Sequence, residues 1–405
     1  MFRIKQPTIE QIIIVLFSIL PIVDSVNGIL ITNGLPSIGT VYKLFTLGLL
    51  FVFSLRKGGI YKSVILPLLL ATMYIIFSIF ANMYFLSGEL INANYPIKLF
   101  FNILTVAMLI NCIHAGYING NSLYKILNIS TWLMIFVILV PYVLGLGYTI
   151  YYGDIGYKGF FYSNNELSAA LIILFYFSLY RLSRKIGIPQ ILQLLCIMVC
   201  VLLLNTKSGM AACLLGGVLF VLEYLLRRDT KYKGLVILAI LLGLYVTKDF
   251  IISQVQGFMT RQTYLHDLYG GSILDTILSG RTFHIENAWE EMQAGSALLL
   301  RLLIGNGFCS ETLVEMDFID IFFYLGTFGV IGLTAFLVWV FVKSIPNFKK
   351  DHTLVRPVGF LTTIGFAFLA GHVFFMATAG CYFVLMCCFC LAYHPDRTEN
   401  IDMTR

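Results

Sequence analysis

Apolar runs long enough to cross a bilayer follow one another along most of this chain. A membrane-spanning helix needs about 20 predominantly apolar residues, and 59% of the 405 residues are hydrophobic while only 12% are charged. Soluble domains carry about 25% charged residues. The runs are continuous rather than alternating, which favours helices over barrel strands. The sequence therefore predicts an all-α integral membrane protein with about twelve transmembrane helices. They lie near residues 9–28, 38–55, 63–86, 96–114, 123–147, 165–182, 189–205, 209–227, 233–250, 317–343, 357–377 and 379–394.

Positive charge is distributed by connection rather than gathered in one patch. Most of the 27 lysines and arginines fall in alternate connections between the predicted helices, and the positive-inside rule makes these connections cytoplasmic. Both termini are then expected to be cytoplasmic. The net charge of +6 forms no basic surface of the kind that nucleic acids need, so no nucleic-acid partner is expected. The first apolar run keeps Pro21 and Asp24 and offers no small-residue cleavage site, so we expect it to remain as the first helix.

The cysteines predict neither a disulfide framework nor a metal site. Eight of the nine lie in or near predicted helices, and only Cys309 falls in an outer connection. The cluster of Cys387, Cys388 and Cys390 lies in an apolar helix, where core packing explains it better than metal binding.

A polar segment, residues 251–316, interrupts the apolar pattern. We expect residues 1–405 to form one membrane domain in which this segment is an extracytoplasmic loop with short helices, between the ninth and tenth transmembrane helices. Residues 282–293 are predicted to form a helix with Trp289 on one face, and residues 296–304 a short apolar segment at the membrane surface. A membrane protein needs no such loop to lie in a bilayer, so we expect it to bind a polar substrate. Its arginines indicate that the substrate is anionic.

Three cations of the outer connections are candidate substrate ligands. The guanidinium of Arg281 matches phosphate oxygens in charge and geometry, although it can also pair with Glu286 or anchor a lipid phosphate. Lys207 lies in a polar turn, residues 205–208, where a lysine can also simply extend to the membrane interface. Arg301 interrupts the short apolar segment of the loop.

Three acidic residues lie at the start of the tenth predicted helix. Asp317 and Asp320 share a helix face, and Glu315 precedes them where the helix dipole stabilises a carboxylate. We expect these acids to converge with Arg281, the Lys207 turn and Asn165 on one outer face. A carboxylate near Arg281 can remove a proton from a sugar hydroxyl. The alternatives are helix capping and cation binding, but Glu-x-Asp is a weak metal pattern, and no metal is expected.

Two further kinds of polar residue are expected to contribute to the same outer face or to the helix interior. Asn165 begins the sixth helix and is a candidate helix cap or substrate contact. It follows a tyrosine-rich connection, residues 147–163, which suits either an interfacial aromatic belt or a surface for stacking sugars. Asp24 and His372 lie within predicted helices, where an ionisable group usually faces a partner or a cavity.

These features resemble the superfamily of bacterial polysaccharide polymerases and O-antigen ligases. The likeness covers the topology from end to end, with about a dozen helices, a large outer loop late in the chain and a glycosyltransferase-C-like architecture. The matching segments are Gly159-Phe160-Phe161 with Asn165, Thr206-Lys207-Ser208 with lysine in place of the usual arginine, Ser279-Gly280-Arg281 with Trp289, and the glycine pairs 305/307 and 326/329. The resemblance implies that Arg281 binds a lipid diphosphate.

One departure from the family pattern bears on the reaction. Counting back eleven residues from Gly326 places Glu315 where the ligases carry a histidine and Met316 where they carry an asparagine. The departure speaks against a ligase mechanism that needs the histidine, and the resemblance then implies the polymerase branch, in which acidic residues occur at this place. A carboxylate can also accept the proton of the acceptor. The candidate catalytic residues are Glu315, Asp317 and Arg281, and the candidate substrate contacts are Lys207, Arg301, Asn165, Asp320 and Trp289.

The resemblance implies an enzyme that transfers a glycan from undecaprenyl diphosphate onto another lipid-linked repeat unit. The reaction would occur at the outer face of the bacterial cytoplasmic (inner) membrane, for O-antigen, capsule or exopolysaccharide. No cofactor is needed because the lipid diphosphate is already an activated leaving group. The implied partners are membrane lipids, lipid-linked glycans, a flippase and a chain-length regulator. The alternatives are a ligase that moves the finished glycan to a lipid or protein, and a lipid-linked oligosaccharide flippase, although the sequence lacks the paired halves typical of transporters.

Overall fold

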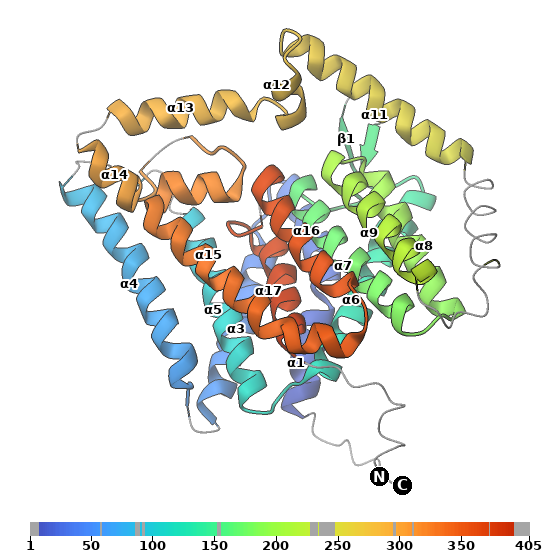
Figure 1. Ribbon diagram of the computed structural model, residues 1–405, viewed down its shortest axis with the longest axis horizontal. Helices are drawn as coiled ribbons and strands as arrows, with labels where there is room; N and C mark the ends of the chain where they lie inside the picture. The colour runs from blue at the N-terminus through green and yellow to red at the C-terminus, as the bar shows by residue number, and fades with distance from the viewer. Residues whose placement is uncertain are drawn as a thin grey trace.

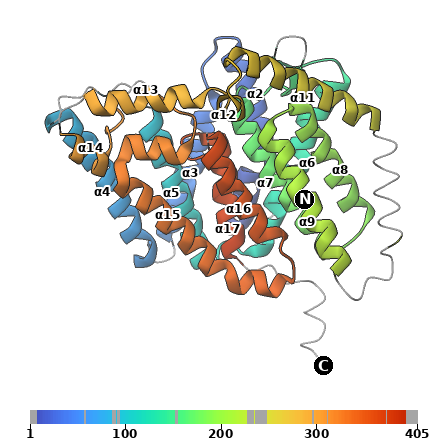
Figure 2. The ribbon, with the colours of Figure 1, turned by 45° about the horizontal axis from the view of Figure 1, so that its top comes forward.

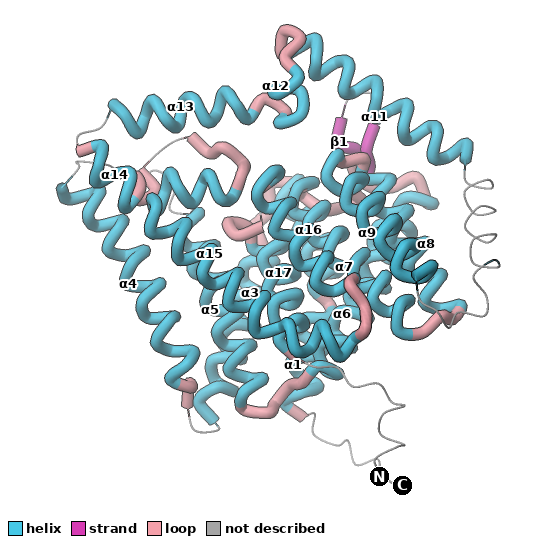
Figure 3. The backbone as a smooth tube through the Cα atoms, in the orientation of Figure 1, coloured by secondary structure: helices cyan, strands magenta, loops and turns pink. Residues whose placement is uncertain are grey.

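The computed structural model describes residues 8–56, 59–85, 90, 94–151, 155–226, 234, 248–294, 297–309, 312–371 and 373–392. Helices make up most of this part of the chain, and its sheet is a single two-stranded hairpin (Figure 3). The prediction of an all-α protein is confirmed. His372 and most of the ninth predicted transmembrane helix, residues 235–247, lie outside the described residues.

The elements follow the predicted apolar runs closely. The first are α1 (Ile9–Ser18), α2 (Leu20–Thr32), α3 (Ile38–Arg56), α4 (Lys62–Phe85), α5 (Asn94–His114), α6 (Gly120–Val143), β1 (Thr149–Tyr151) and β2 (Ile155–Tyr157), with the two strands antiparallel. Next come α7 (Asn164–Arg184), α8 (Ile188–Leu204), α9 (Lys207–Leu226), α11 (Lys248–Leu268), α12 (Ile273–Leu278), α13 (Arg281–Ala294) and α14 (Leu298–Ile304). The last are α15 (Asp317–Asp351), α16 (Val355–Ala370) and α17 (Ala377–Leu391).

Among the described residues, seven helices are long and apolar enough to cross a membrane, namely α3, α4, α5, α6, α7, α9 and α15. Helices α1 and α2, bent by 43°, make an eighth if they form one span. Helices α8, α16 and α17 are apolar but shorter, with 17, 16 and 15 residues. The chain is therefore a helical membrane protein, while the number of twelve spans stays a prediction.

The centre of the bundle is formed by α7 and α17, which other helices surround (Figure 1). Every residue of α7 from Leu167 to Leu182 is buried, and so is every residue of α17 from Ala379 to Cys390. A helix that is apolar on all sides is stable only where neighbours cover all of it. The cysteine cluster at residues 387–390 lies in this core, as the sequence predicts.

Helix α4 has the reverse pattern, with its apolar side chains outside and its polar ones inside. Leu66, Leu70 and Phe77 are exposed, whereas Ser78 and Asn82 are buried. In a bilayer the exposed apolar side chains meet lipid, and polar groups turn toward neighbouring helices. This orientation indicates that α4 lies at the lipid-facing edge of the bundle.

Helix α15 is broken at Gly326, and α14 packs into the break. Gly326 has φ 62° and ψ −168°, and a Cβ there would lie 2.4 Å from the carbonyl oxygen of Leu303. Only glycine fits both conditions. The carbonyls released at Phe323 and Tyr324 accept hydrogen bonds from the Asn306 and Gly307 amides, at 2.7 and 2.9 Å. The turn after α14 therefore replaces the helical bonds that α15 loses.

The inner face of α4 stabilises the same junction. The hydroxyl of Tyr74 donates to the Leu325 carbonyl, Ser78 Oγ donates to Ile304 O at 2.7 Å, and Asn82 Nδ2 donates to Gly305 O at 3.0 Å. Buried backbone carbonyls in a membrane protein need such partners because lipid offers none.

Helices α11, α12 and α13 lie across the end of the bundle at which α9 and α15 begin (Figures 1 and 2). The helix predicted at residues 282–293 is confirmed as α13, and the short apolar segment predicted at 296–304 contains α14. The polar segment thus consists mainly of helices rather than of open loop.

Candidate functional site

Arg281 and Glu315 meet at this end of the bundle. Arg281 is the first residue of α13, after a turn in which Ser279 and Gly280 have φ of 57° and 77°. Its Nε donates to the Glu315 carbonyl at 3.1 Å, and one terminal nitrogen lies 3.4 Å from the carboxylate oxygen Oε2. The Arg281 side chain is only 13% exposed, while that of Glu315 is 44% exposed. The sequence prediction that Arg281 lies near the acids is therefore confirmed.

Two backbone carbonyls complete the surroundings of the Arg281 guanidinium. Leu278 O accepts from it at 3.1 Å, and Ala370 O, at the end of α16, accepts at 3.4 Å. The pairing with Glu286 that the sequence also allows is not among the contacts of Arg281, whose carboxylate partner is Glu315. One guanidinium thus joins α13, α16 and the start of α15.

Glu315 has a left-handed backbone conformation, with φ 64°, which residues other than glycine and asparagine seldom adopt. Asp320 stabilises it by accepting the amides on both sides, from Val314 at 2.8 Å and from Met316 at 3.0 Å. Gly371 packs against the other side, where a Cβ would lie 2.3 Å from the Glu315 carbonyl oxygen. The carboxylate of Glu315 is therefore presented by a tightly specified turn.

Asp317 accepts hydrogen bonds from the backbone amides of a second turn in the same way. Its Oδ2 accepts from the amides of Val373 and Phe374, at 2.7 and 2.9 Å, and the residue is 1% exposed. Asp320 is 2% exposed. The structure brings all three predicted acids together, but it commits Asp317 and Asp320 to backbone amides. This geometry favours Glu315 over Asp317 as the candidate proton acceptor, and it gives Asp320 a positioning contact rather than an open face for substrate.

The Lys207 turn lies against the segment that leads into Arg281. Asn205 ends α8 in a left-handed conformation, and Lys207 begins α9. The Lys207 ammonium donates to the Thr276 carbonyl and lies 3.2 Å from Ser279 Oγ. Arg261 of α11 donates to the Asn205 carbonyl at 3.3 Å, and Arg261 and Arg281 are both close enough to repel the Lys207 charge. The predicted meeting of this turn with Arg281 is confirmed.

Arg301 and Trp289 lie in other surroundings. Arg301 donates to Asn306 Oδ1 at 3.2 Å, beside the turn that follows α14. Trp289 is 38% exposed on α13, eight positions after Arg281, or about 12 Å along the helix. Their predicted contacts with substrate stay predictions.

Asn165 is not the helix cap that the sequence suggests. Ser163 caps α7 by accepting from the Glu166 amide, because α7 already begins at Asn164. Asn165 is therefore a residue of the first turn, half-buried. The adjacent Glu166 accepts from the Thr378 amide at 3.3 Å, which ties the start of α7 to the start of α17.

The sequence analysis missed Lys98 and Tyr95 of α5. The Lys98 ammonium lies 3.4 Å from the sulfur of Met376, and the Tyr95 ring stacks on that of Tyr324 with 6.1 Å between centroids. The signal for both was present, because a lysine and a tyrosine separated by three positions share a helix face. Their partners lie 278 and 229 positions further along the chain, and such contacts cannot be read from the pattern.

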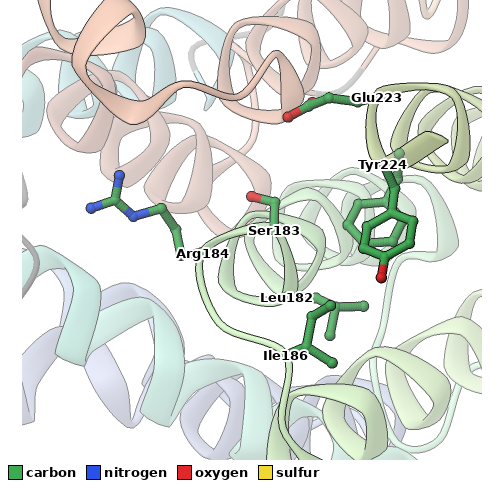
Figure 4. A pocket seen from close by; sticks show the side chains of 7 residues that line it. Leu182, Ser183, Arg184, Ile186, Glu223 and Tyr224 are labelled. Atoms are coloured by element: carbon green, nitrogen blue, oxygen red, sulfur yellow. The ribbon is translucent and has the colours of Figure 1, made fainter. Parts of the chain in front are cut away.

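Two observations concern possible binding sites other than the one around Arg281. The described residues contain no group of three or more His, Cys, Asp or Glu side chains placed to hold a metal ion. A pocket of about 200 Å³ lies at the opposite end of α16 from Arg281, near Glu223, whose carboxylate accepts from Thr353 and Leu354 (Figure 4). It is lined by Leu182, Ser183, Arg184, Ile186, Phe220, Glu223 and Tyr224. This pocket shares no residue with the Arg281 site.

Comparison with known proteins assigns no family to the chain. Neither the family models searched nor the curated proteins searched gave a match to this sequence.

Proposed function

We propose that this protein is a membrane glycosyltransferase that polymerises lipid-linked repeat units. It transfers a glycan from undecaprenyl diphosphate onto a second lipid-linked repeat at the outer face of the bacterial cytoplasmic membrane. The observation that carries the proposal is the contact of Arg281 with Glu315, beside the Lys207 turn. A fixed guanidinium next to a half-exposed carboxylate supplies both functions the reaction needs, an anion-binding group and a proton acceptor.

The proposal includes a topology. Twelve helices in a glycosyltransferase-C-like arrangement cross the membrane, both termini are cytoplasmic, and α11 to α14 form the extracytoplasmic segment. The positive-inside pattern supports this orientation. So does the gathering of the polar helices across one end of the bundle (Figure 2).

The reaction is a substitution at an anomeric carbon. The hydroxyl oxygen of the acceptor sugar attacks that carbon in the donor, and the bond from the carbon to the phosphate oxygen breaks. The electron pair of this bond leaves with the lipid diphosphate. The hydroxyl proton passes to the carboxylate of Glu315, which then releases it to water. Arg281 and Lys207 stabilise the negative charge that grows on the leaving diphosphate.

The contacts of Arg281 suggest an order of events. Its hydrogen bonds to Glu315 O and Leu278 O are both 3.1 Å long, while those to Glu315 Oε2 and Ala370 O are 3.4 Å long. The longer pair is the easier to exchange for phosphate oxygens, which form short charge-assisted bonds with guanidinium. Binding of the diphosphate then releases the Glu315 carboxylate, so that the proton acceptor becomes available once the donor is in place.

The test uses the purified full-length protein with lipid-linked repeat units, and products are resolved by length on a gel. Arg281→Ala is expected to lower the rate of chain growth about 10²- to 10³-fold, which is typical of losing one group that stabilises a developing oxyanion. Arg281→Lys keeps the charge but loses the planar fork, so its rate of chain growth should lie between those of the wild type and Arg281→Ala. Wild-type chain growth by Arg281→Ala would contradict the assigned role.

A deletion strain separates polymerase from ligase. Loss of a polymerase leaves single repeats on the lipid carrier, whereas loss of a ligase leaves long lipid-linked chains. We expect single repeats. The control is complementation by Lys185→Met, a change in the connection between α7 and α8, which should restore chains of normal length.

A further inference from the structure

Lys98 is a half-buried cation that forms no ion pair with any carboxylate of the described residues. Its ammonium lies 3.4 Å from the Met376 sulfur and 5.9 Å from the centroid of the Tyr95 ring, and no carboxylate of the described residues lies within ion-pair distance. A thioether is only a weak acceptor, and an aromatic ring offsets little of the charge. A charge in partly buried surroundings is costly without a counter-charge. The missing counter-charge is what a ligand can supply.

Lys43 shows how the same bundle accommodates a lysine that serves the fold. Its ammonium lies 2.6 Å from Asp24 Oδ1 and 2.9 Å from Thr378 Oγ1, and the residue is 5% exposed. Both lysines approach the start of α17, Lys43 at Thr378 and Lys98 at Met376. Lys43 is neutralised by a carboxylate, whereas Lys98 pairs with none in the part of the chain that the structure describes.

Gly371 and residues 373–376 connect Lys98 with the candidate active site. Gly371 packs against the backbone of Glu315, and Met376 contacts Lys98. Asn102, one helical turn after Lys98, stabilises the segment by donating to the carbonyls of Phe374 and Met376, at 2.8 and 3.0 Å. Lys98 thus contacts the stretch of chain that also packs against Glu315.

Tyr95 brings the face of α5 that carries Lys98 close to the acids. Its ring stacks on Tyr324, and its hydroxyl is near enough to Glu315 and Asp320 to interact with their charges. Lys98 follows Tyr95 by three positions on the same face. Lys98 therefore lies on the face of α5 that packs against the start of α15, the element that follows Glu315.

We propose that Lys98 binds an anionic group of the substrate on the α5 side of residues 373–376. The inference rests on the proposed function and adds to it a second anion-binding position besides Arg281. The group is either a phosphate of a lipid diphosphate, which donor and acceptor both carry, or a carboxylate on a glycan. An ammonium binds both as a point charge.

The test compares Lys98→Met with Lys98→Arg in the purified full-length protein. Two quantities are measured: the Kd of farnesyl diphosphate, a short prenyl diphosphate, by calorimetry, and the apparent KM for lipid-linked repeats. Lys98→Met is expected to raise at least one of them about tenfold, the effect of losing a hydrogen bond to a charged group. Lys98→Arg should stay near the wild-type value because it keeps the charge. Lys125→Met, an exposed position on α6, is the matched control.

The two readouts identify the bound group. A raised Kd for farnesyl diphosphate assigns Lys98 to a phosphate, whereas a raised KM with an unchanged Kd assigns it to a glycan carboxylate. Wild-type values of both for Lys98→Met would overturn the proposal. If farnesyl diphosphate binding depends on Lys98 but the wild-type protein builds no chains, the anion site stands and the polymerase assignment falls.

Discussion

Glu315 holds a backbone conformation that costs free energy, and a neighbouring side chain maintains it. A residue other than glycine in the left-handed region carries a cost of about 1–3 kcal/mol. Asp320 offsets this by accepting the two amides that flank Glu315, and each such bond to an ionised acceptor contributes about 1.5–3 kcal/mol. Strain maintained in this way is typical of residues whose direction matters for function. The carboxylate direction is thus set by a residue whose own oxygens are committed to backbone amides.

Asp320→Asn should therefore impair turnover more than substrate binding. Asparagine has one carbonyl oxygen in place of two carboxylate oxygens, so either the Val314 or the Met316 amide loses its acceptor. We expect the rate of chain growth to fall at least about tenfold, the kinetic equivalent of 1.4 kcal/mol, while the apparent KM for lipid-linked repeats changes little.

Asp317→Asn is the comparison for this experiment. It releases one amide of residues 373–374 instead and leaves both bonds around Glu315 intact. If Asp320→Asn turns over at the wild-type rate, or if only its KM changes, the positioning role is wrong.

The helices themselves are fixed to one another by buried charges at a few points. Asp24 of α2 and Lys43 of α3 form an ion pair, both 5% exposed, and Lys43 also reaches Thr378 of α17. The sequence prediction that Asp24 faces a partner is confirmed, since an isolated carboxylate in a membrane helix is costly. Three helices are thereby held in one register.

Lys43→Met should destabilise the protein strongly, because it leaves the Asp24 charge buried without a partner. Breaking a buried pair costs about 3–5 kcal/mol, whereas replacing both partners is often nearly neutral. The double variant Asp24→Asn with Lys43→Met should accordingly have a higher Tm than the single variant when both are unfolded thermally in the same detergent. Equal Tm values for the single and double variants would show that the pair contributes no such coupling.

The elements and their bounds could be predicted from the sequence, but the breaks within them could not. Hydropathy reports which side chains avoid water, so it located both ends of α4 within one residue and the start of α15, although α15 continues eight residues past the predicted end. It says nothing about backbone direction, so the bend between α1 and α2 and the break at Gly326 were missed. The polar stripe of Tyr74, Ser78 and Asn82, at steps of four, was readable as one helix face but was not used.

At the candidate site, the residue types were predicted and their partners were not. The meeting of Arg281 with Glu315 followed from the expectation that outer cations and acids converge. The roles of Asp317 and Asp320 depend on which amides lie opposite their carboxylates, and those of Asp317 come from residues more than fifty positions away. Spacing along one helix cannot show such partners.

For the molecule as a whole, the orientation in the membrane is the prediction on which the site depends. Arg281, Lys207 and Cys309 belong to the proposed extracytoplasmic side. Cys309 is suited to a direct test, because the other eight cysteines lie in or near the apolar helices. Burial raises the pKa of its thiol, and the charge of nearby Arg301 partly opposes this rise.

A membrane-impermeant maleimide added to intact spheroplasts should therefore label Cys309, and Cys309→Ser should abolish the signal. The thiolate is the reacting species. Because the pKa of the thiol is raised, the labelling rate should increase with pH and reach its half-maximum at a higher pH than a free cysteine peptide does. Labelling that requires the membrane to be opened would reverse the proposed orientation.

The break at Gly326 also decides how deep the acids of α15 lie. At 1.5 Å per residue, an unbroken helix of 35 residues would be about 52 Å long, far more than a hydrocarbon core about 30 Å thick. The part after Gly326, residues 327–351, measures about 38 Å and suffices to traverse that core with a modest tilt. The nine residues before it are then free to run at the headgroup level. Asp317 and Asp320 thus escape the insertion penalty that a hydropathy profile would assign to them.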